Sequence, residues 1–352
     1  MKSGVRKDDG EGVFSLSGIE GLKRKEAYSR RIRKIEIIIA SILLASFAVF
    51  LVIAAFAIQR DGMAKFIQGL ESINLYYFAA ALVVIFMGYV MRFPKWEYYL
   101  KRLKVSIPRK ENFMIYLSMY SMDMTPGRWG RAVVAYTINR RTGVKFARTF
   151  PAIVADIFTD FLGFAVILAV STLMVHRFVL ISTVITILLL VPFFFIYVRR
   201  PFEFIKRKFG HIRRLKSIFD TGKLYFEYHK LLSRNAYAYS MVYTVPAMFM
   251  NGLALYLVIL SFGVPMPISF LPTVLFIFTS SLILGMISGL PATLGITDAA
   301  LVGYLTLFFP NLIDIGLASL ITIFFRIASV WFVEGFGMSA LLYTMRYWKR
   351  GG

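Results

Sequence analysis

Residues 113–122 read FMIYLSMYSM, residues 123–131 read DMTPGRWGR and residues 132–138 read AVVAYTI. A second stretch repeats this plan, with TVLFIFTSSLILGMI at 273–287, SGLPATLGITD at 288–298 and AALVGYLTLFF at 299–309. In each, Pro and Gly interrupt a hydrophobic segment, and the arms are shorter than the about 20 apolar residues that a membrane-spanning helix needs. Matching breaks in the two halves of a chain are typical of the substrate site of a transporter.

The composition is that of a membrane protein, since 58% of the residues are hydrophobic and the mean hydropathy is +0.67. Six uninterrupted runs are expected to cross the bilayer: Ile37–Ile58, Leu75–Met91, Phe150–Val175, Phe178–Val198, Tyr237–Phe262 and Ile315–Tyr343. The chain has no cysteine, and its three histidines, His176, His211 and His229, are far apart. We therefore expect no disulfide, no metal centre and no cofactor.

The formal net charge of +22 comes from basic residues that lie between the hydrophobic runs. In a soluble protein such a charge would suggest nucleic acid as a partner. Here it is expected to orient the spans, because Lys and Arg accumulate in cytoplasmic loops, and to attract anionic lipid headgroups. Nucleic-acid binding is not expected.

The basic loops predict a topology. They flank the first broken segment on both sides, whereas residues 263–267 and 310–314, which flank the second, contain no Lys or Arg. A segment that begins and ends on one side of the membrane is re-entrant. The predicted fold is an all-α polytopic bundle of six full spans and two oppositely oriented re-entrant helical hairpins, an inverted repeat. The alternative, two kinked full spans, would place the basic loop 199–235 outside, against the charge rule.

The predicted organisation is a basic cytoplasmic tail at 1–35, a transmembrane domain at 36–345 and a cytoplasmic C-terminal tail at 346–352. The expected location is the cell membrane, with both termini in the cytoplasm. Within the domain, the loop 199–235 has apolar residues at helical spacing among Lys and Arg. It predicts either an amphipathic helix on the cytoplasmic leaflet or a helical linker packed on the bundle.

The first break carries the residues of a candidate anion site. Thr125 is suited to cap a helix that begins at Pro126 and Gly127, because a threonine oxygen accepts a free backbone N–H and proline lacks that donor. Arg128 and Arg131, three residues apart, are expected on one face of that helix. Helix N-termini and arginine both bind phosphate. In the alternative interpretation, the two arginines only extend toward the headgroups.

Further ionisable residues fall within hydrophobic segments, where each is a functional candidate because burial of charge in lipid is costly. Asp156 and Asp160, four residues apart, share a helix face and need a cation or a proton. They are expected to pair with Arg128 or Arg131, to relay protons, or to bridge to Arg326.

At the second break, Pro291 or Thr297 is expected to begin the returning helix, with Asp298 in its first turn. A carboxylate at that place caps the helix or, in the second interpretation, contacts Arg326 as part of a gate. Glu334 lies eight residues beyond Arg326, so both are expected to face the interior. The sequence contains no Gly-rich phosphate loop, metalloprotease or nucleophile motif, and we expect no enzyme.

These motifs together resemble the lysylphosphatidylglycerol synthase transmembrane (flippase-like) family over roughly residues 36–345. The resemblance is carried by four short motifs: TPGRWG at 125–130, DIFTD at 156–160, LPATLGITD at 290–298, and Arg326 with Trp331 and Gly335. The chain departs from the family pattern at Arg131, where Glu is usual, at Asp156-Ile157, where Glu-Arg is frequent, and in the second motif, which tends to be Pro-Gly-Gly-x-Gly-x-x-Glu. The resemblance implies the translocation half alone, without the aminoacyl-transfer or glycosyltransferase domains of other relatives.

The expected function is a lipid translocase that moves an anionic-headgroup lipid, such as an aminoacyl-phospholipid or a polyprenyl-phosphate carrier, between leaflets. The expected partner is that lipid. Two alternatives remain: a non-catalytic membrane subunit of a separate lipid synthase, and a membrane enzyme acting on lipid phosphate with Asp156 or Asp160 as base.

Overall fold

The computed structural model describes residues 63–123, 125–175, 234–290 and 293–350, together with isolated residues between 48 and 59. The predicted tail 1–35, the predicted span Phe178–Val198, Pro291, and nearly all of the span Ile37–Ile58 and of the loop 199–235 lie outside the described residues. The chain divides into two compact units, Met1–Ala48 and Val49–Gly352. Every contact described below lies within the second unit.

The described part of the chain is helical and contains no strand, as predicted. Its elements are α2 (Met63–Glu71), α3 (Leu75–Arg102), α4 (Arg109–Ser118), η1 (Met119–Met122), η2 (Pro126–Ala132), α5 (Val133–Thr142), α6 (Phe146–Val175), α10 (Arg234–Ser261), η3 (Ile268–Phe270), α11 (Leu271–Ile287), α12 (Ile296–Phe308), α13 (Ile315–Arg326), η5 (Ile327–Trp331) and α14 (Phe332–Arg350). Here η1, η2 and η3 are 3₁₀ helices, and η5 is a π-helix.

Five helices in the described ranges are long and apolar enough to cross a membrane: Leu75–Arg102, Phe146–Val175, Asn235–Ser261, Ile268–Ile287 and Ile315–Met345. Four of these match predicted spans. The fifth, η3 with α11, is the first arm of the second broken segment. The expectation that this arm is too short to span was therefore wrong, because the helix begins five residues earlier than Thr273 and reaches 20 residues.

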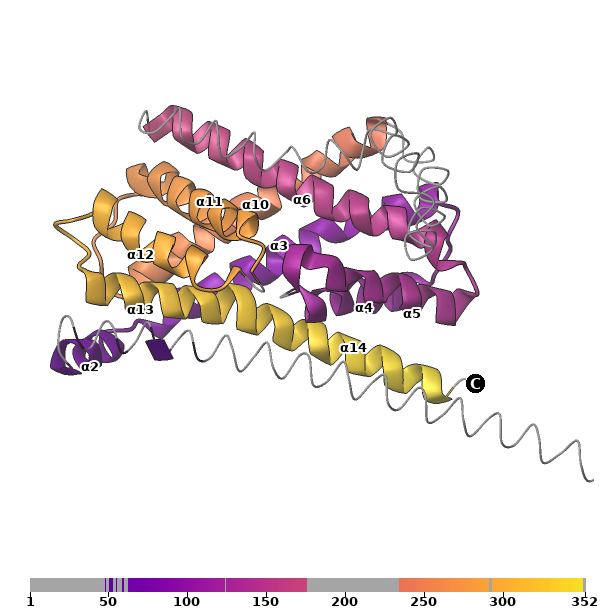
Figure 1. The fold of residues 1–352 in the computed structure, drawn as a ribbon, viewed down its shortest axis with the longest axis horizontal. Coiled ribbons are helices and arrows are strands. Elements are labelled where there is room, and N and C mark those ends of the chain that lie inside the picture. The colour runs from indigo at the N-terminus through magenta and orange to yellow at the C-terminus, as the bar shows by residue number, and fades with distance from the viewer. Residues whose placement is uncertain are drawn as a thin grey trace, which may run out of the picture. The chain divides into compact units, whose positions relative to one another are not determined.

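Both predicted breaks are present. The first helix ends at Met122 and the next begins at Pro126, while the second pair is separated by residues 288–295. In each case the chain turns back, so that α4 packs on α5 and α11 packs on α12. Figure 1 shows α11 and α12 side by side, with α13 continuing into α14 below them. The breaks thus form the turns of two helical hairpins.

Long-range packing brings the two hairpins into one bundle. Helix α10 packs along α3, α6 contacts both α10 and α11, and α14 packs on α4 and η1. At this last contact, a Cβ on Gly337 would lie 2.5 Å from the backbone nitrogen of Ser121, so only glycine allows such a close approach. The first break is therefore held against the C-terminal helix.

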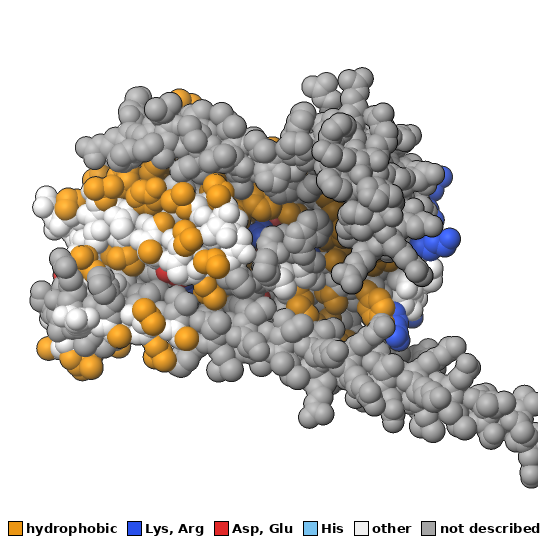
Figure 2. Space-filling view, in the orientation of Figure 1, with side chains coloured by type: hydrophobic (Ala, Val, Ile, Leu, Met, Phe, Trp, Pro, Cys, Tyr) orange, Lys and Arg blue, Asp and Glu red, His pale blue; other side chains and the backbone are white. Residues whose placement is uncertain are grey.

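The outer surface agrees with a bilayer environment. Ile268 and Leu307 are among the exposed large hydrophobic residues, and Figure 2 shows hydrophobic side chains gathered around α11 and α12. Arg140 and Arg141 are exposed in the last turn of α5, on a side where Lys and Arg side chains are visible. An apolar flank with basic residues at one end is the expected pattern for a multi-pass membrane protein.

Candidate functional site

At the first break a helix begins at Pro126, as predicted, but it is the 3₁₀ helix η2 and Thr125 does not cap it through its side chain. Thr125 has extended backbone angles at the N-cap, Pro126 follows at the first position of η2, and the Gly130 N–H donates to Thr125 Oγ1 at 2.7 Å. Arg128 and Arg131 reach the same carboxylates, those of Asp123 and Asp160.

Arg131 is completely buried and holds three carboxylates together. Its Nε lies 2.6 Å from Asp123 Oδ1, and its Nη1 lies 2.8 Å from Asp156 Oδ2 and 3.1 Å from Asp160 Oδ2. The alternative that this side chain extends to the headgroups is therefore wrong. Arg128 is different, since 18% of its side chain is exposed and it lies at the edge of a cavity.

Asp156 and Asp160 are buried on α6 and pair with Arg131, and Asp160 also pairs with Arg128, so the expected pairing is confirmed. Two further cations, which were not predicted as partners, complete the set. Lys95 Nζ lies 3.0 Å from Asp156 Oδ1 and 2.7 Å from Asp160 Oδ1, and Arg92 Nη1 lies 2.9 Å from Asp160 Oδ2. The predicted bridge from these carboxylates to Arg326 is not formed; Arg326 pairs with Asp298 instead.

The predicted span Leu75–Met91 leaves Arg92 and Lys95 in the basic loop that follows it, and this prediction was wrong. Helix α3 continues through Pro94 to Arg102, and the two side chains are 2% and 0% exposed. Their three-residue spacing was the available signal, because it places both on the helix face that also carries Trp96 and Tyr99 in the buried core.

The resulting charge cluster, defined here as Arg92, Lys95, Asp123, Arg128, Arg131, Asp156 and Asp160, contains four cations and three carboxylates among the described residues. Three guanidinium groups converge on one atom, Asp160 Oδ2, although a carboxylate oxygen offers about two lone pairs. Arg128 makes the longest of these contacts, at 3.3 Å, and its distance to Asp123 is 3.8 Å. The excess positive charge is therefore least compensated at Arg128.

Aromatic rings surround the arginines of the cluster. The guanidinium of Arg92 lies 4.3 Å from the centre of the Tyr89 ring and 5.4 Å from that of Tyr120, while Arg131 lies 4.9 Å from Tyr120. The Tyr120 hydroxyl donates to the Tyr116 hydroxyl, which donates to the Tyr89 carbonyl, both at 2.8 Å. The rings exclude water and favour the cations through their negative faces.

At the second break, Asp298 both caps a helix and binds an arginine. Helix α12 begins at Ile296, and the Gly295 N–H donates to Asp298 Oδ2 at 2.8 Å. Arg326 Nε donates to Asp298 Oδ1 at 2.6 Å. Asp298 therefore makes both the predicted cap and the predicted contact to Arg326. Thr297 lies within the helix rather than before it, and is buried.

The π-helix η5 follows Arg326 directly and places Ser329 and Val330 in the cavity wall. Glu334, in the first turn of α14, lines the same wall as Arg326, as its spacing predicted. Short π-helical segments inside longer helices occur frequently at functional sites.

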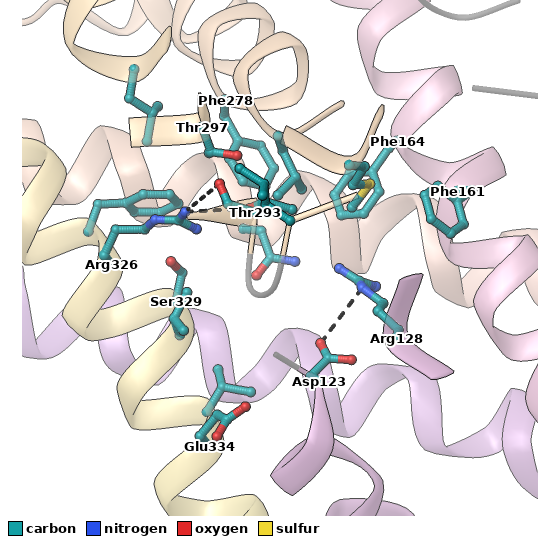
Figure 3. A pocket seen from close by; sticks show the side chains of 18 of the residues that line it. Asp123, Arg128, Phe161, Phe164, Phe278, Thr293, Thr297, Arg326, Ser329 and Glu334 are labelled. Carbon is teal, nitrogen blue, oxygen red and sulfur yellow. Dashed lines mark hydrogen bonds and ion pairs between the residues drawn. The ribbon is translucent and has the colours of Figure 1, made fainter. Parts of the chain in front are cut away.

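The two breaks face each other across one cavity of about 1030 Å³ of atom-free space, part of which is open to the outside. Figure 3 shows Asp123 and Arg128 on one side of this space, and Thr293, Arg326 and Ser329 on the other, with Phe164 and Phe278 nearby. Thr125, Arg92 and Thr297 also contribute to the walls, whereas Arg131, Asp156 and Asp160 are not among the lining residues. The cavity thus combines charged groups with aromatic and aliphatic walls.

Within the ranges that the structure describes, no three His, Cys, Asp or Glu side chains gather as ligands for a metal ion. The fold and the cavity define a multi-pass helical membrane protein with a polar site between two broken helical segments. The sequence matches the model of the lysylphosphatidylglycerol synthase TM region over residues 38–337, most of the chain, and the protein belongs to that family. No curated protein matches the sequence.

Proposed function

We propose that the protein is a lipid translocase, which moves a lipid with an anionic headgroup between leaflets without chemical change. The observation that carries the proposal is Arg128, an incompletely paired cation at the wall of a cavity inside a membrane bundle. A buried excess charge is costly in a low-dielectric medium unless an ion of opposite sign compensates it. A lipid phosphate at Arg128 supplies that ion. Aminoacyl-phospholipids, which the family name suggests, and polyprenyl phosphates both carry it.

The proposed path places only the headgroup in the cavity. The phosphate enters between the two breaks and meets Arg128, while the acyl chains remain in the bilayer beside the exposed apolar residues of α11 and α12. The walls include Phe161, Phe164 and Phe325, so the headgroup leaves bulk water as it enters. The attraction between the phosphate and Arg128 then acts in a medium of lower dielectric constant and is stronger than in water.

We also propose that the two hairpins are re-entrant and enter from opposite sides, with both termini in the cytoplasm of a cell-membrane protein. The first arm of the first hairpin, 10 residues of α4 and 4 of η1, is about 23 Å long at 1.5 and 2.0 Å per residue, and the 13 residues of α12 extend about 20 Å, against a hydrocarbon core of about 30 Å. The length of α11 permits a full crossing, yet its packing on α12 supports a hairpin that returns.

The proposal is tested by reconstituting the protein in liposomes and measuring leaflet exchange of fluorescent phosphatidylglycerol and of a polyprenyl phosphate. Arg128→Gln is expected to lower the exchange rate about tenfold or more, because a hydrogen bond to a charged group contributes about 1.5–3 kcal/mol. Lys101→Gln, which removes an exposed charge near the end of α3, is the matched control. Exchange no faster than in protein-free liposomes for every lipid tested would reject the proposal.

A further inference from the structure

Arg92 is a second cation at the cavity, and not all of its donor nitrogens are hydrogen-bonded within the described residues. Arg92 lines the cavity, is 2% exposed, and donates to Asp160 Oδ2 through Nη1 and to the Gly88 carbonyl through Nε. Its remaining nitrogen, Nη2, has no hydrogen-bond partner among the described residues. A buried donor without a partner costs roughly 1–3 kcal/mol, so such a group calls for an explanation.

Arg92 and Arg128 form a fork around one carboxylate oxygen. Their Nη1 atoms lie 2.9 Å and 3.3 Å from Asp160 Oδ2, so the two guanidinium groups approach each other at that atom, and both line the cavity. Arg131 also has an unpartnered Nη2, but it binds three carboxylates and does not reach the cavity wall. The pair of arginines that lines the cavity is therefore Arg92 with Arg128, rather than Arg131 with Arg128.

The backbone at Arg128 supports this assignment. Its φ is +60°, in the left-handed region that residues other than glycine rarely adopt, and such angles cluster at ligand-binding sites. The strained backbone directs this side chain toward the place where Arg92 also arrives, since both contact the same oxygen.

We propose that Arg92 and Arg128, which both line the cavity, together form a phosphate subsite, with their two guanidinium groups as donors to one phosphate group. The assignment rests on the proposed function and deepens it, because it adds Arg92 as a second residue that recognises the lipid phosphate. Two arginine forks match the oxygens of a phosphate monoester or diester better than a point charge does.

Binding is the direct test, with purified protein in micelles of a neutral detergent. Thermal unfolding midpoints are followed against increasing phosphatidylglycerol, diacylglycerol of the same chains, and inorganic phosphate. Arg92→Gln is expected to weaken phosphatidylglycerol binding about tenfold, the effect of losing one charge-assisted hydrogen bond. Diacylglycerol, which lacks the phosphate, is expected to bind all variants equally, and Lys101→Gln to bind phosphatidylglycerol as the wild type does.

Two variants at Arg92 distinguish the loss of a phosphate donor from a loss of folding. Removal of Arg92 leaves three cations against three carboxylates in the cluster, so Arg92→Gln is expected to fold. Arg92→Lys keeps the charge opposite Asp160 but lacks the second nitrogen, and is expected to bind phosphatidylglycerol more weakly than wild type. If both variants bind it as tightly as the wild type, the subsite is wrong.

The remaining outcomes distinguish lipid phosphate from free phosphate as the ligand. They also distinguish failure of the phosphate subsite from failure of the translocase proposal. Inorganic phosphate that binds as tightly as phosphatidylglycerol, with the same loss in Arg92→Gln, supports the subsite and identifies free phosphate as its ligand. Arg92-dependent binding without leaflet exchange in liposomes supports the subsite and rejects the translocase. Leaflet exchange that Arg92→Gln and Arg92→Lys leave unchanged, with unchanged binding, rejects the subsite and leaves the translocase intact.

Discussion

The first break gathers four cations and three carboxylates among the described residues, whereas the second break holds one pair, Arg326 with Asp298. The described residues of the two breaks share one backbone feature, a non-glycine residue with positive φ, Arg128 at +60° and Thr293 at +57°. Because the two breaks differ in charge, we expect them to have different roles. The cluster at the first break has one more cation than carboxylates among the described residues, whereas the second break pairs one cation with one carboxylate and joins α12 to α13.

Loss of a carboxylate from the first break is expected to have the largest effect on stability. Asp160→Ala leaves four cations against two carboxylates, and breaking a buried ionic network by removing one partner costs about 3–5 kcal/mol. The measurement is the thermal or denaturant unfolding of purified protein in detergent. Glu111→Gln is the control, because its pair with Arg141 is exposed and worth about 0–1 kcal/mol. Similar costs for both variants would show that the cluster is not a tightly coupled network.

The pair at the second break is expected to show strong coupling of its two members. Arg326→Gln and Asp298→Asn should each destabilise the protein by about 3 kcal/mol, because each leaves a buried charge without its partner. The double variant should cost clearly less than the two singles together, with a coupling energy of about 1–3 kcal/mol. Strict additivity in a double-mutant cycle would contradict the internal balance proposed for this break.

The tight turn of the second hairpin gives the next prediction. A Cβ on Gly285 would collide with Thr297 Oγ1 and would lie 2.7 Å from Thr293 Cβ, whereas a Cβ on Gly303 in α12 meets nothing within 4 Å. Gly285→Ala is therefore expected to destabilise by about 1–3 kcal/mol through overpacking. Gly303→Ala, the matched control, should stabilise by about 0.5–1 kcal/mol because alanine favours helix. Equal melting temperatures for the two variants would refute the close packing of α11 on α12.

The smallest expected effect concerns the backbone shared by the two breaks. Arg128→Gly and Thr293→Gly should each be about 1 kcal/mol more stable than the corresponding alanine variant, because only glycine adopts positive φ without strain. The thermal unfolding midpoints of the four variants measure this difference in stability between glycine and alanine. Alanine variants that match or exceed the glycine variants would indicate that the two turns are not strained.

Much of the fold was accessible from hydrophobic runs and from Pro and Gly. Both breaks lie where these residues interrupt the pattern, and four predicted spans were confirmed within the described residues. The helix start at Pro126 was predictable because proline suits the first position of a helix. The first arm of the second segment was predicted too short, because Ile268, Ser269 and Phe270 were excluded although they form a 3₁₀ turn that continues into α11.

The partners of the candidate site were harder to predict, because they depend on tertiary contact. Asp156 and Asp160 required cations, yet Arg92 and Lys95 are more than 60 residues away in the sequence. Because Arg92 and Lys95 were predicted to lie in a loop, the continuation of α3 to Arg102 was not predicted. Arg131 was expected beside the ligand, but its position in a 3₁₀ turn directs it into the carboxylates behind the cavity wall. Only a three-dimensional arrangement distinguishes a donor that faces a ligand from one that supports it.

The charge cluster also has a consequence for biogenesis. Its members come from α3, from the first break and from α6, so no single helix carries its own counter-ions. Inserted alone, α6 would bring two aspartates into hydrocarbon, at a cost of about 2.5–3.5 kcal/mol for each charged residue near the middle of a helix. Insertion beside an already placed α3 removes that cost through Arg92 and Lys95. Because α3 is synthesised before α6, Arg92 and Lys95 precede Asp156 and Asp160 along the nascent chain.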